Sequence, residues 1–191
     1  MTLLKSLQLP MGTPIIDFSL PATDGKTYSP ADFYDKKVLV VIFMCNHCPY
    51  IKAVIDRLIA LQSDYADKGV QLIGINSNDA EEYPEDSFEA MQNWVEEKGI
   101  NFVYCQDESQ EVAKAYQAQC TPDIFVFDAE KKLAYHGRVD DDWQEEDKVT
   151  QKDLRAALDA ILAGTPVPAP QQPSMGCSIK WKPQNNDQLT N

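Results

Sequence analysis

The sequence predicts a single α/β domain in which helices cover a mixed central sheet. Residues 37–44 form a continuous run of β-branched and aromatic side chains, which is typical of a strand buried on both faces. From Pro49 onward the apolar residues recur at helical spacing, and similar changes from strand to helix follow along the chain. Strand–helix–strand units favour parallel pairing with right-handed crossovers.

Each predicted element follows from a local pattern. Residues 15–28 alternate loosely around the turn signal Asp24-Gly25, which predicts an N-terminal hairpin. Ser29-Pro30 is typical of an N-cap and the first residue of a brief helix. Further strands are expected over residues 37–44, 70–75, 102–104, 124–127 and 133–139, and a polar loop is expected over residues 76–86. One helix is expected to begin at Pro49 and end at Gly69, and another to begin at Phe88 and end at Gly99. Ser109 and Thr150 are expected to cap two more helices. The last two strands are adjacent and predict an antiparallel hairpin, so the sheet is mixed.

The composition changes at the end of this pattern. We expect a domain over residues 1–163 and a proline-rich tail over residues 164–191, whose prolines favour an extended path. A purely solvated tail has little reason to carry Ile179 and Trp181. We therefore expect the tail to pack back onto the domain.

Charge and hydropathy exclude several classes of partner. The 191 residues include 17 Lys and Arg against 30 Asp and Glu, which gives a formal net charge of −13. Such an acidic protein repels nucleic acids and anionic membrane surfaces, so neither is an expected partner. The longest apolar run falls far short of the ~20 residues of a membrane span, and the N-terminus lacks the features of a signal peptide. A cytoplasmic location is the resulting expectation.

Cysteine chemistry is the main functional signal. The chain has five cysteines, an odd number that argues against a structural disulfide framework. Cys45 and Cys48 form a Cys-x-x-Cys motif between a predicted buried strand and a predicted helix. Two cysteines three residues apart on a first helical turn can close a disulfide, and a helix N-terminus stabilises a thiolate.

This placement assigns roles within the motif. We expect Cys45 to be the more exposed cysteine and the nucleophile, and Cys48 to be the resolving thiol. A protonated His47 would lower the pKa of Cys45 further. The alternative interpretation is that His47 is only a polar residue at the helix start.

The strand–Cys-x-x-Cys–helix unit resembles the thioredoxin superfamily. Thr121-Pro122 matches the position of its cis-proline, and the resemblance implies that these two residues hold an extended substrate chain. Residues 12–20 and 137–141 resemble the peroxiredoxin-like branch of alkyl hydroperoxide reductase and thiol-specific antioxidant proteins. The resemblance implies a three-layer thioredoxin-like fold with a redox-active dithiol and no cofactor.

Two departures from these families affect the function. Peroxiredoxins carry a hydroxyl residue three positions before the reactive cysteine, whereas Ile42 stands there in this chain. Dithiol–disulfide exchange is therefore favoured over peroxidase activity. The central strand also lacks the buried acid of thioredoxins, which leaves the proton acceptor for Cys48 unidentified.

The other polar groups offer alternatives. Cys120 and Cys177 are candidate auxiliary redox residues, whereas Cys105 fits a structural role. Zinc could in principle use Cys45, His47, Cys48 and Cys120, but neighbouring residues on a helix point in different directions, so we expect no metal. His136 is expected at the surface, and the acidic residues within 140–147 in a solvated loop.

The sequence thus predicts a thiol–disulfide oxidoreductase that uses the Cys45/Cys48 pair. Its expected partners are disulfide-containing proteins or small-thiol substrates, together with an electron-donating reductant. The alternatives are a thiol peroxidase that reduces hydroperoxides and a non-catalytic redox sensor.

Overall fold

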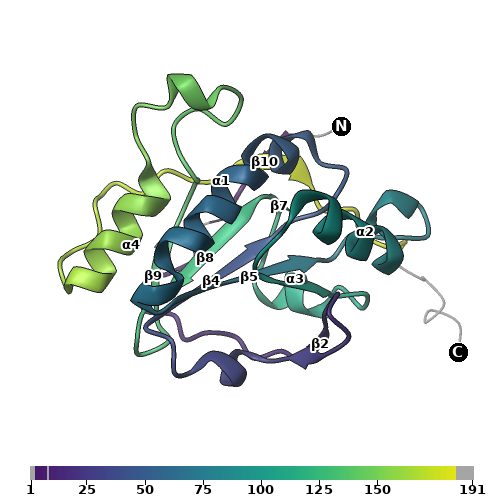
Figure 1. Ribbon diagram of the computed structural model, residues 1–191, viewed down its shortest axis with the longest axis horizontal. Helices are drawn as coiled ribbons and strands as arrows, with labels where there is room; N and C mark the ends of the chain where they lie inside the picture. Colours follow the sequence, from purple (N-terminus) through teal and green to yellow (C-terminus); the bar gives the residue numbers. More distant parts are fainter. Residues whose placement is uncertain (1–2, 8, 184–191) are drawn as a thin grey trace, which may run out of the picture.

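A mixed five-stranded sheet forms the centre of the protein. The computed structural model describes residues 3–7 and 9–183, and the strand order is β6-β5-β4-β8-β9 (Figure 1). The pairs β4–β5 and β5–β6 are parallel, whereas β4–β8 and β8–β9 are antiparallel, which confirms the predicted mixed sheet and final hairpin. The strands are β4 (Val38–Phe43), β5 (Val70–Asn76), β6 (Val103–Gln106), β8 (Asp123–Phe127) and β9 (Leu133–His136).

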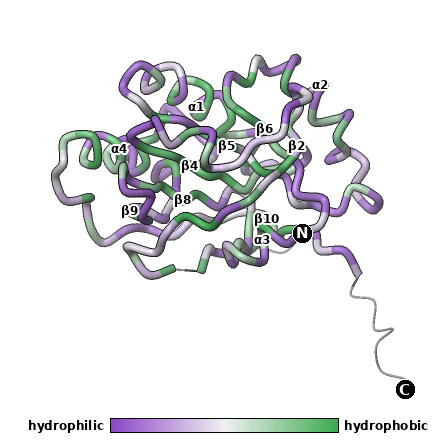
Figure 2. The backbone as a smooth tube through the Cα atoms, turned by 90° about the horizontal axis from the view of Figure 1, so that it is seen from below, coloured by the Kyte–Doolittle hydropathy of each residue, from purple (hydrophilic) through white to green (hydrophobic). Residues whose placement is uncertain are grey.

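Strand β4 explains why helices cover both faces of this sheet. All six of its residues are buried, and successive side chains point to opposite faces. Val38, Val40 and Ile42 pack into the cluster formed with α1, α2 and α4. The alternate residues of β4 pack toward α3 and the N-terminal segment. Figure 2 shows the hydrophobic stretches gathered in these central strands.

The helices are α1 (Pro49–Tyr65), α2 (Phe88–Lys98), α3 (Glu111–Ala115) and α4 (Asp153–Ala163). The short 3-10 helices are η1 (Pro30–Phe33), η2 (Ala66–Lys68), η3 (Pro84–Asp86) and η4 (Glu146–Lys148).

The predicted N-terminal hairpin is present. Strands β2 (Leu20–Pro21) and β3 (Thr27–Tyr28) pair in antiparallel fashion around a turn in which Gly25 adopts a φ of +82°. Side chains do not readily adopt this conformation, so glycine suits the turn.

Two predicted helix caps are wrong. Helix α3 has Gln110 as its N-cap, while the Ser109 hydroxyl donates to the Asp107 carboxylate and accepts from the backbone amide of Glu111. Helix α4 begins after Lys152, and Thr150 bonds to the carboxylate of Asp141. The N-cap thus lies one residue later than predicted for α3 and two residues later for α4, and in both cases the expected capping hydroxyl donates to a nearby carboxylate.

The tail contributes a strand that the sequence did not predict. Strand β10 (Met175–Ser178) lies between β1 (Leu3–Lys5) and β7 (Cys120–Thr121) in a separate three-stranded antiparallel sheet. Beyond this strand, Ile179 is buried and Trp181 is exposed. The last part of the tail, residues 184–191, lies outside the described residues.

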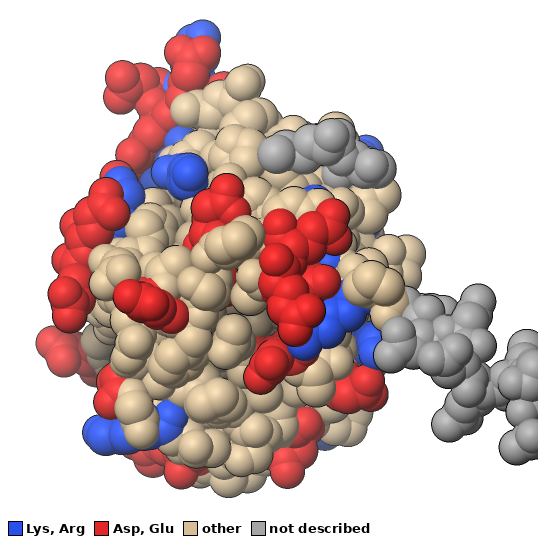
Figure 3. All heavy atoms as spheres, turned by 90° about the vertical axis from the view of Figure 1, so that its right-hand side faces the viewer, with Lys and Arg blue, Asp and Glu red and all other residues tan. Residues whose placement is uncertain are grey.

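Acidic side chains are spread over much of the face seen in Figure 3, and basic side chains occupy smaller patches there. This surface agrees with the net charge of −13. Within residues 3–7 and 9–183, no helix has the length and apolar character to cross a membrane.

Candidate redox site

The Cys-x-x-Cys motif connects the buried strand β4 to helix α1. Cys48 is the N-cap of α1, and Cys45 lies three residues earlier in the connecting segment. Both are buried, with Cys45 1% and Cys48 0% exposed. The prediction that Cys45 is the more exposed cysteine therefore does not distinguish the two, because neither is accessible. The positive end of the helix also acts at Cys48 instead of Cys45.

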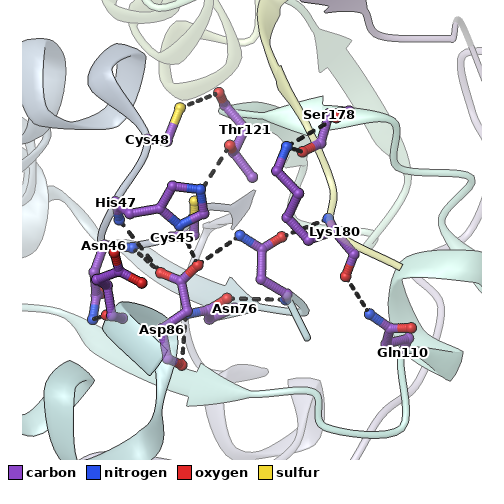
Figure 4. A network of polar contacts seen from close by, with 12 residues as sticks. Cys45, Asn46, His47, Cys48, Asn76, Asp86, Gln110, Thr121, Ser178 and Lys180 are labelled. Carbon is purple, nitrogen blue, oxygen red and sulfur yellow. Dashed lines mark hydrogen bonds and ion pairs between the residues drawn. The ribbon is translucent and has the colours of Figure 1, made fainter. Parts of the chain in front are cut away.

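The segment before β8 covers the two sulfur atoms. The Thr121–Pro122 peptide bond is cis. Thr121 Oγ1 lies 3.6 Å from Cys45 Sγ, and the neutral Cys48 thiol donates a hydrogen bond to the Thr121 carbonyl oxygen at 3.2 Å (Figure 4). The structure thus brings together the two cysteines and the Thr121-Pro122 pair that the sequence singled out.

The two thiols determine each other's ionisation. Their mutual hydrogen bond is the largest influence on both, and it raises the pKa of Cys45 well above its usual range and lowers that of Cys48 to about 5. Burial opposes ionisation of both groups, while contacts of Cys48 with Thr121 and Cys177 lower the pKa of Cys48 further. The contact between the two cysteines therefore favours ionisation of Cys48 over ionisation of Cys45. The sequence predicts the opposite order of ionisation, and which cysteine attacks a substrate stays a prediction.

Asp86 holds the segment between the two cysteines. This carboxylate is fully buried and comes from η3, far from the motif in sequence. It accepts hydrogen bonds from the backbone amide of Asn46 at 2.7 Å and from Asn78 Nδ2 at 2.8 Å. Its Oδ2 atom lies 2.5 Å from His47 Nδ1. These bonds fix the connecting segment against η3.

The charge of His47 is directed to Asp86. The hydrogen bond to Asp86 raises the pKa of His47. Burial disfavours the ionised Asp86, but its bonds to His47 and Asn78 outweigh this and lower its pKa. The Asp86 charge in turn helps to raise the pKa of Cys45. The Asp86 carboxylate largely balances the charge of the protonated His47. The effect of His47 on the pKa of Cys45 therefore stays a prediction.

Residues 11–136 match the model of the AhpC/TSA family, which is named after alkyl hydroperoxide reductase and thiol-specific antioxidant proteins. The chain belongs to the AhpC/TSA family. This membership confirms the predicted resemblance and places the protein in a thioredoxin-like redox family. The broader prediction of a thiol-based oxidoreductase or peroxidase is thereby confirmed.

Solved structures similar to this AhpC/TSA protein extend over nearly its whole length. An uncharacterized conserved protein from Geobacillus kaustophilus is 48% identical, with a TM-score of 0.91 over 96% of this chain and 98% of its own. A hypothetical protein from Sinorhizobium meliloti 1021 is 44% identical, with a TM-score of 0.89 over 93% of this chain and 98% of its own. A thiol:disulfide interchange protein from Chlorobium tepidum TLS is 21% identical, with a TM-score of 0.63 over 81% and 99%, and shares the fold. No curated protein matches the chain.

One cluster of metal-binding residue types occurs in the described part of this AhpC/TSA protein. Ligand atoms of Cys45, His47 and Asp86 lie within 4.8 Å of one another. Zinc holds nitrogen and oxygen ligands at about 2.0–2.2 Å each, and a tetrahedral arrangement separates them by more than the 2.5 Å between His47 Nδ1 and Asp86 Oδ2. The arrangement fits a hydrogen-bonded ion pair instead of a metal centre.

The remaining cysteines of the AhpC/TSA domain differ in their surroundings. Cys120 is buried with its sulfur 3.5 Å from the Pro122 carbonyl oxygen, and burial raises its pKa. Cys105 lies in β6 within the opposite core cluster, and burial raises its pKa to about 12. Cys177 lies in the same cluster as Cys45 and Cys48.

Sequence reasoning missed several buried charges. His136 is buried, with Nε2 2.8 Å from Asp123 Oδ1, so its expected place at the surface is wrong. Asp140 is also buried, because Arg57 from α1 bonds to its carboxylate at 2.8 Å. Asp86 was overlooked because it lies in a polar stretch that resembles an ordinary loop. Its position two residues before a predicted helix was the only local signal.

Proposed function

We propose that this AhpC/TSA protein is a thiol–disulfide oxidoreductase that cycles the Cys45/Cys48 pair between dithiol and disulfide. The observation that carries the proposal is the burial of both sulfur atoms against Thr121, beside the cis-Pro122. Cys45 Sγ lies 3.6 Å from Thr121 Oγ1, and Cys48 Sγ lies 3.2 Å from the Thr121 carbonyl oxygen. A thiolate on one member and a thiol on the other is the state that disulfide exchange requires.

The charges of the site support an order of steps. The Cys48 thiolate attacks a substrate disulfide, forms a bond to one substrate sulfur and releases the other as a thiolate. Cys45 then loses its proton and attacks Cys48, which releases the second substrate sulfur and closes the Cys45–Cys48 disulfide. The Asp86 carboxylate lies within 4.8 Å of the Cys45 sulfur and is our candidate acceptor for this proton, which passes on to a departing thiolate.

The covering strand limits how substrates reach the pair. Thr121 pairs with Cys177 of β10, so a chain that binds at Thr121 and Pro122 does so only after β10 separates from β7.

We propose disulfide-containing proteins or small disulfides as substrates and a separate electron donor that reduces the Cys45–Cys48 disulfide. Nucleic acids and membranes are not among the proposed partners, and the proposed location is the cytoplasm.

Mass spectrometry of a model exchange reaction tests this proposal. Reduced wild-type protein incubated with a peptide disulfide should release two peptide thiols per molecule and form a disulfide inside residues 38–52, the tryptic peptide that contains both cysteines. The Cys45→Ser/Cys177→Ser variant, which lacks both other thiols of the buried cluster around Cys48, should retain one peptide on Cys48. Cys105→Ser, a buried cysteine in the other core cluster, is the matched control and should behave like the wild type. An adduct that forms on neither Cys45 nor Cys48 would contradict the proposal.

A peroxidase is the second candidate function. The Thr121 hydroxyl lies 3.6 Å from Cys45 Sγ and supplies, from another element, the hydroxyl that Ile42 cannot provide. Peroxide would oxidise a cysteine of the pair to a sulfenic acid, which the other cysteine would condense with to give the disulfide and water. Stopped-flow measurement separates the two functions. A rate with peroxide no faster than that of a free thiol at equal thiolate concentration would exclude the peroxidase.

A further inference from the structure

Strand β10 brings a third cysteine to the redox site. Cys177 is in antiparallel register with Thr121, and Ser178 is in register with Cys120. Side chains directly opposite each other in an antiparallel pair lie on the same face of the sheet, and successive residues alternate between faces. Cys177 therefore shares the face on which Thr121 contacts the cysteine pair, whereas Cys120 lies on the other face.

The positions of the sulfur atoms agree with this alternation. Cys177 is 1% exposed and belongs to the same buried cluster as Cys45 and Cys48. Cys48 Sγ lies 3.2 Å from the carbonyl oxygen of Thr121, the register partner of Cys177. The interaction between the Cys48 and Cys177 side chains lowers the pKa of Cys48, and it adds to the effect of burial in raising the pKa of Cys177 to about 12. Cys48 thus has a cysteine partner from its own segment and another from the tail.

Close backbone packing holds Cys177 in this place. A Cβ atom on the preceding residue, Gly176, would lie 2.0 Å from the Thr121 carbonyl oxygen and 2.7 Å from the carbonyl carbon. Only glycine allows β10 to approach β7 this closely. On its other side β10 pairs with β1, where Cys177 is in register with Leu3. Both neighbouring strands therefore fix the position of the third sulfur.

We propose that Cys177 is a third redox thiol, which forms a disulfide with Cys48 in exchange for the Cys45–Cys48 bond. This inference rests on the proposed function, since that reaction supplies the first disulfide. Cys177 loses its proton and attacks the Cys48 sulfur, so that the Cys48–Cys177 bond forms and the Cys45–Cys48 bond breaks. Cys45 leaves and takes up a proton, and the number of electrons in the protein does not change.

The exchange has a structural consequence. The Cys48–Cys177 disulfide fastens β10 to the start of α1 and returns Cys45 to the thiol form. Oxidised protein would then exist as two disulfide isomers, one with the tail strand linked covalently to the site and one without. The electron-donating reductant would have to reduce both forms.

Disulfide mapping of the full-length chain tests this inference. Reduced protein is oxidised with diamide, blocked with N-ethylmaleimide under denaturing conditions and digested with trypsin without reduction. Residues 38–52 contain Cys45 and Cys48, residues 156–180 contain Cys177, residues 115–131 contain Cys120 and residues 99–114 contain Cys105. A Cys45–Cys48 disulfide stays within one peptide, whereas a Cys48–Cys177 disulfide joins two.

The variants give distinct outcomes. The wild type and the Cys105→Ser control should yield both disulfides. In Cys45→Ser, most of Cys48 should form the disulfide that joins residues 38–52 to residues 156–180. Cys177→Ser should yield only the disulfide within residues 38–52. The inference is overturned if Cys45→Ser leaves Cys177 fully blocked by maleimide or links Cys48 to residues 115–131. A wild type that forms no disulfide within residues 38–52 would instead refute the proposed function.

Discussion

Gly176→Ala tests how strongly β10 closes the redox site. The new Cβ atom would lie 2.0 Å from the Thr121 carbonyl oxygen, whereas ordinary contacts begin near 3.4 Å, so the two strands must move apart by more than 1 Å. Backbone atoms on both sides leave no side chain that can move away. The variant should lose the pairing of β10 with β7, at about 1 kcal/mol per hydrogen bond, and part of the burial of Ile179, at about 1.5–3 kcal/mol when complete.

We therefore expect the docking of β10 to weaken by about 3 kcal/mol, which corresponds to about a 100-fold rise in the population of the open form. Two assays measure this effect: the midpoint of urea unfolding and the rate at which Cys48 reacts with a thiol reagent. Ser178→Ala on the same strand is the control, because it removes a hydroxyl without adding a Cβ next to β7. An unchanged unfolding midpoint together with an unchanged thiol reaction rate in Gly176→Ala would refute this reasoning.

Four further predictions concern the ionisable groups of the redox site and the buried His136–Asp123 pair. Asp86→Asn should return the raised pKa of His47 toward 6.5, as measured by NMR titration, and a value that does not move would contradict the ion pair. The Asp86–His47 ion pair should stabilise the fold by about 2 kcal/mol between pH ~4 and ~6.5. This stabilisation is lost at lower pH, where Asp86 becomes protonated below its lowered pKa, and at higher pH, where His47 loses its proton above its raised pKa. Ultraviolet titration of the reduced protein should detect a thiolate that disappears as the pH falls through about 5, and Cys48→Ser should abolish that transition; a wild-type midpoint near 9 would exclude it. His136→Ala leaves the buried Asp123 carboxylate without its partner and should lower the free energy of unfolding by about 3 kcal/mol, whereas a loss below 1 kcal/mol would show that water replaces the imidazole.

Local sequence patterns predicted the elements of the central sheet because burial on both faces requires continuous apolar runs. The run that became β4 and the helical spacing of α1 are such cases. The sheet formed by β1, β7 and β10 could not be predicted in this way. Its strands have two to four residues, too few for a recognisable period, and they are far apart in the sequence. Strand β10 pairs with β1 across at least 170 positions and with β7 across more than 50 positions.

The motif itself was visible in the sequence, but its electrostatics were not. The Cys-x-x-Cys spacing identified the two sulfur atoms, and the resemblance identified Thr121 and the cis-Pro122. The exposure of Cys45 depended on what covers it, and the covering segments lie more than 70 positions away in sequence. The role of Asp86 likewise depends on a contact across 39 positions, which no local pattern encodes.

The reduction potential of the Cys45/Cys48 pair is the most direct test of the central claim. Protein equilibrated in buffers of defined glutathione ratio is acid-quenched, and the disulfide within residues 38–52 is quantified by mass spectrometry. We predict a single two-electron transition with closure of this disulfide, which Cys45→Ser and Cys48→Ser both eliminate. A pair that stays in the dithiol form at every ratio, or that only acquires glutathione on one sulfur, would contradict a dithiol–disulfide enzyme.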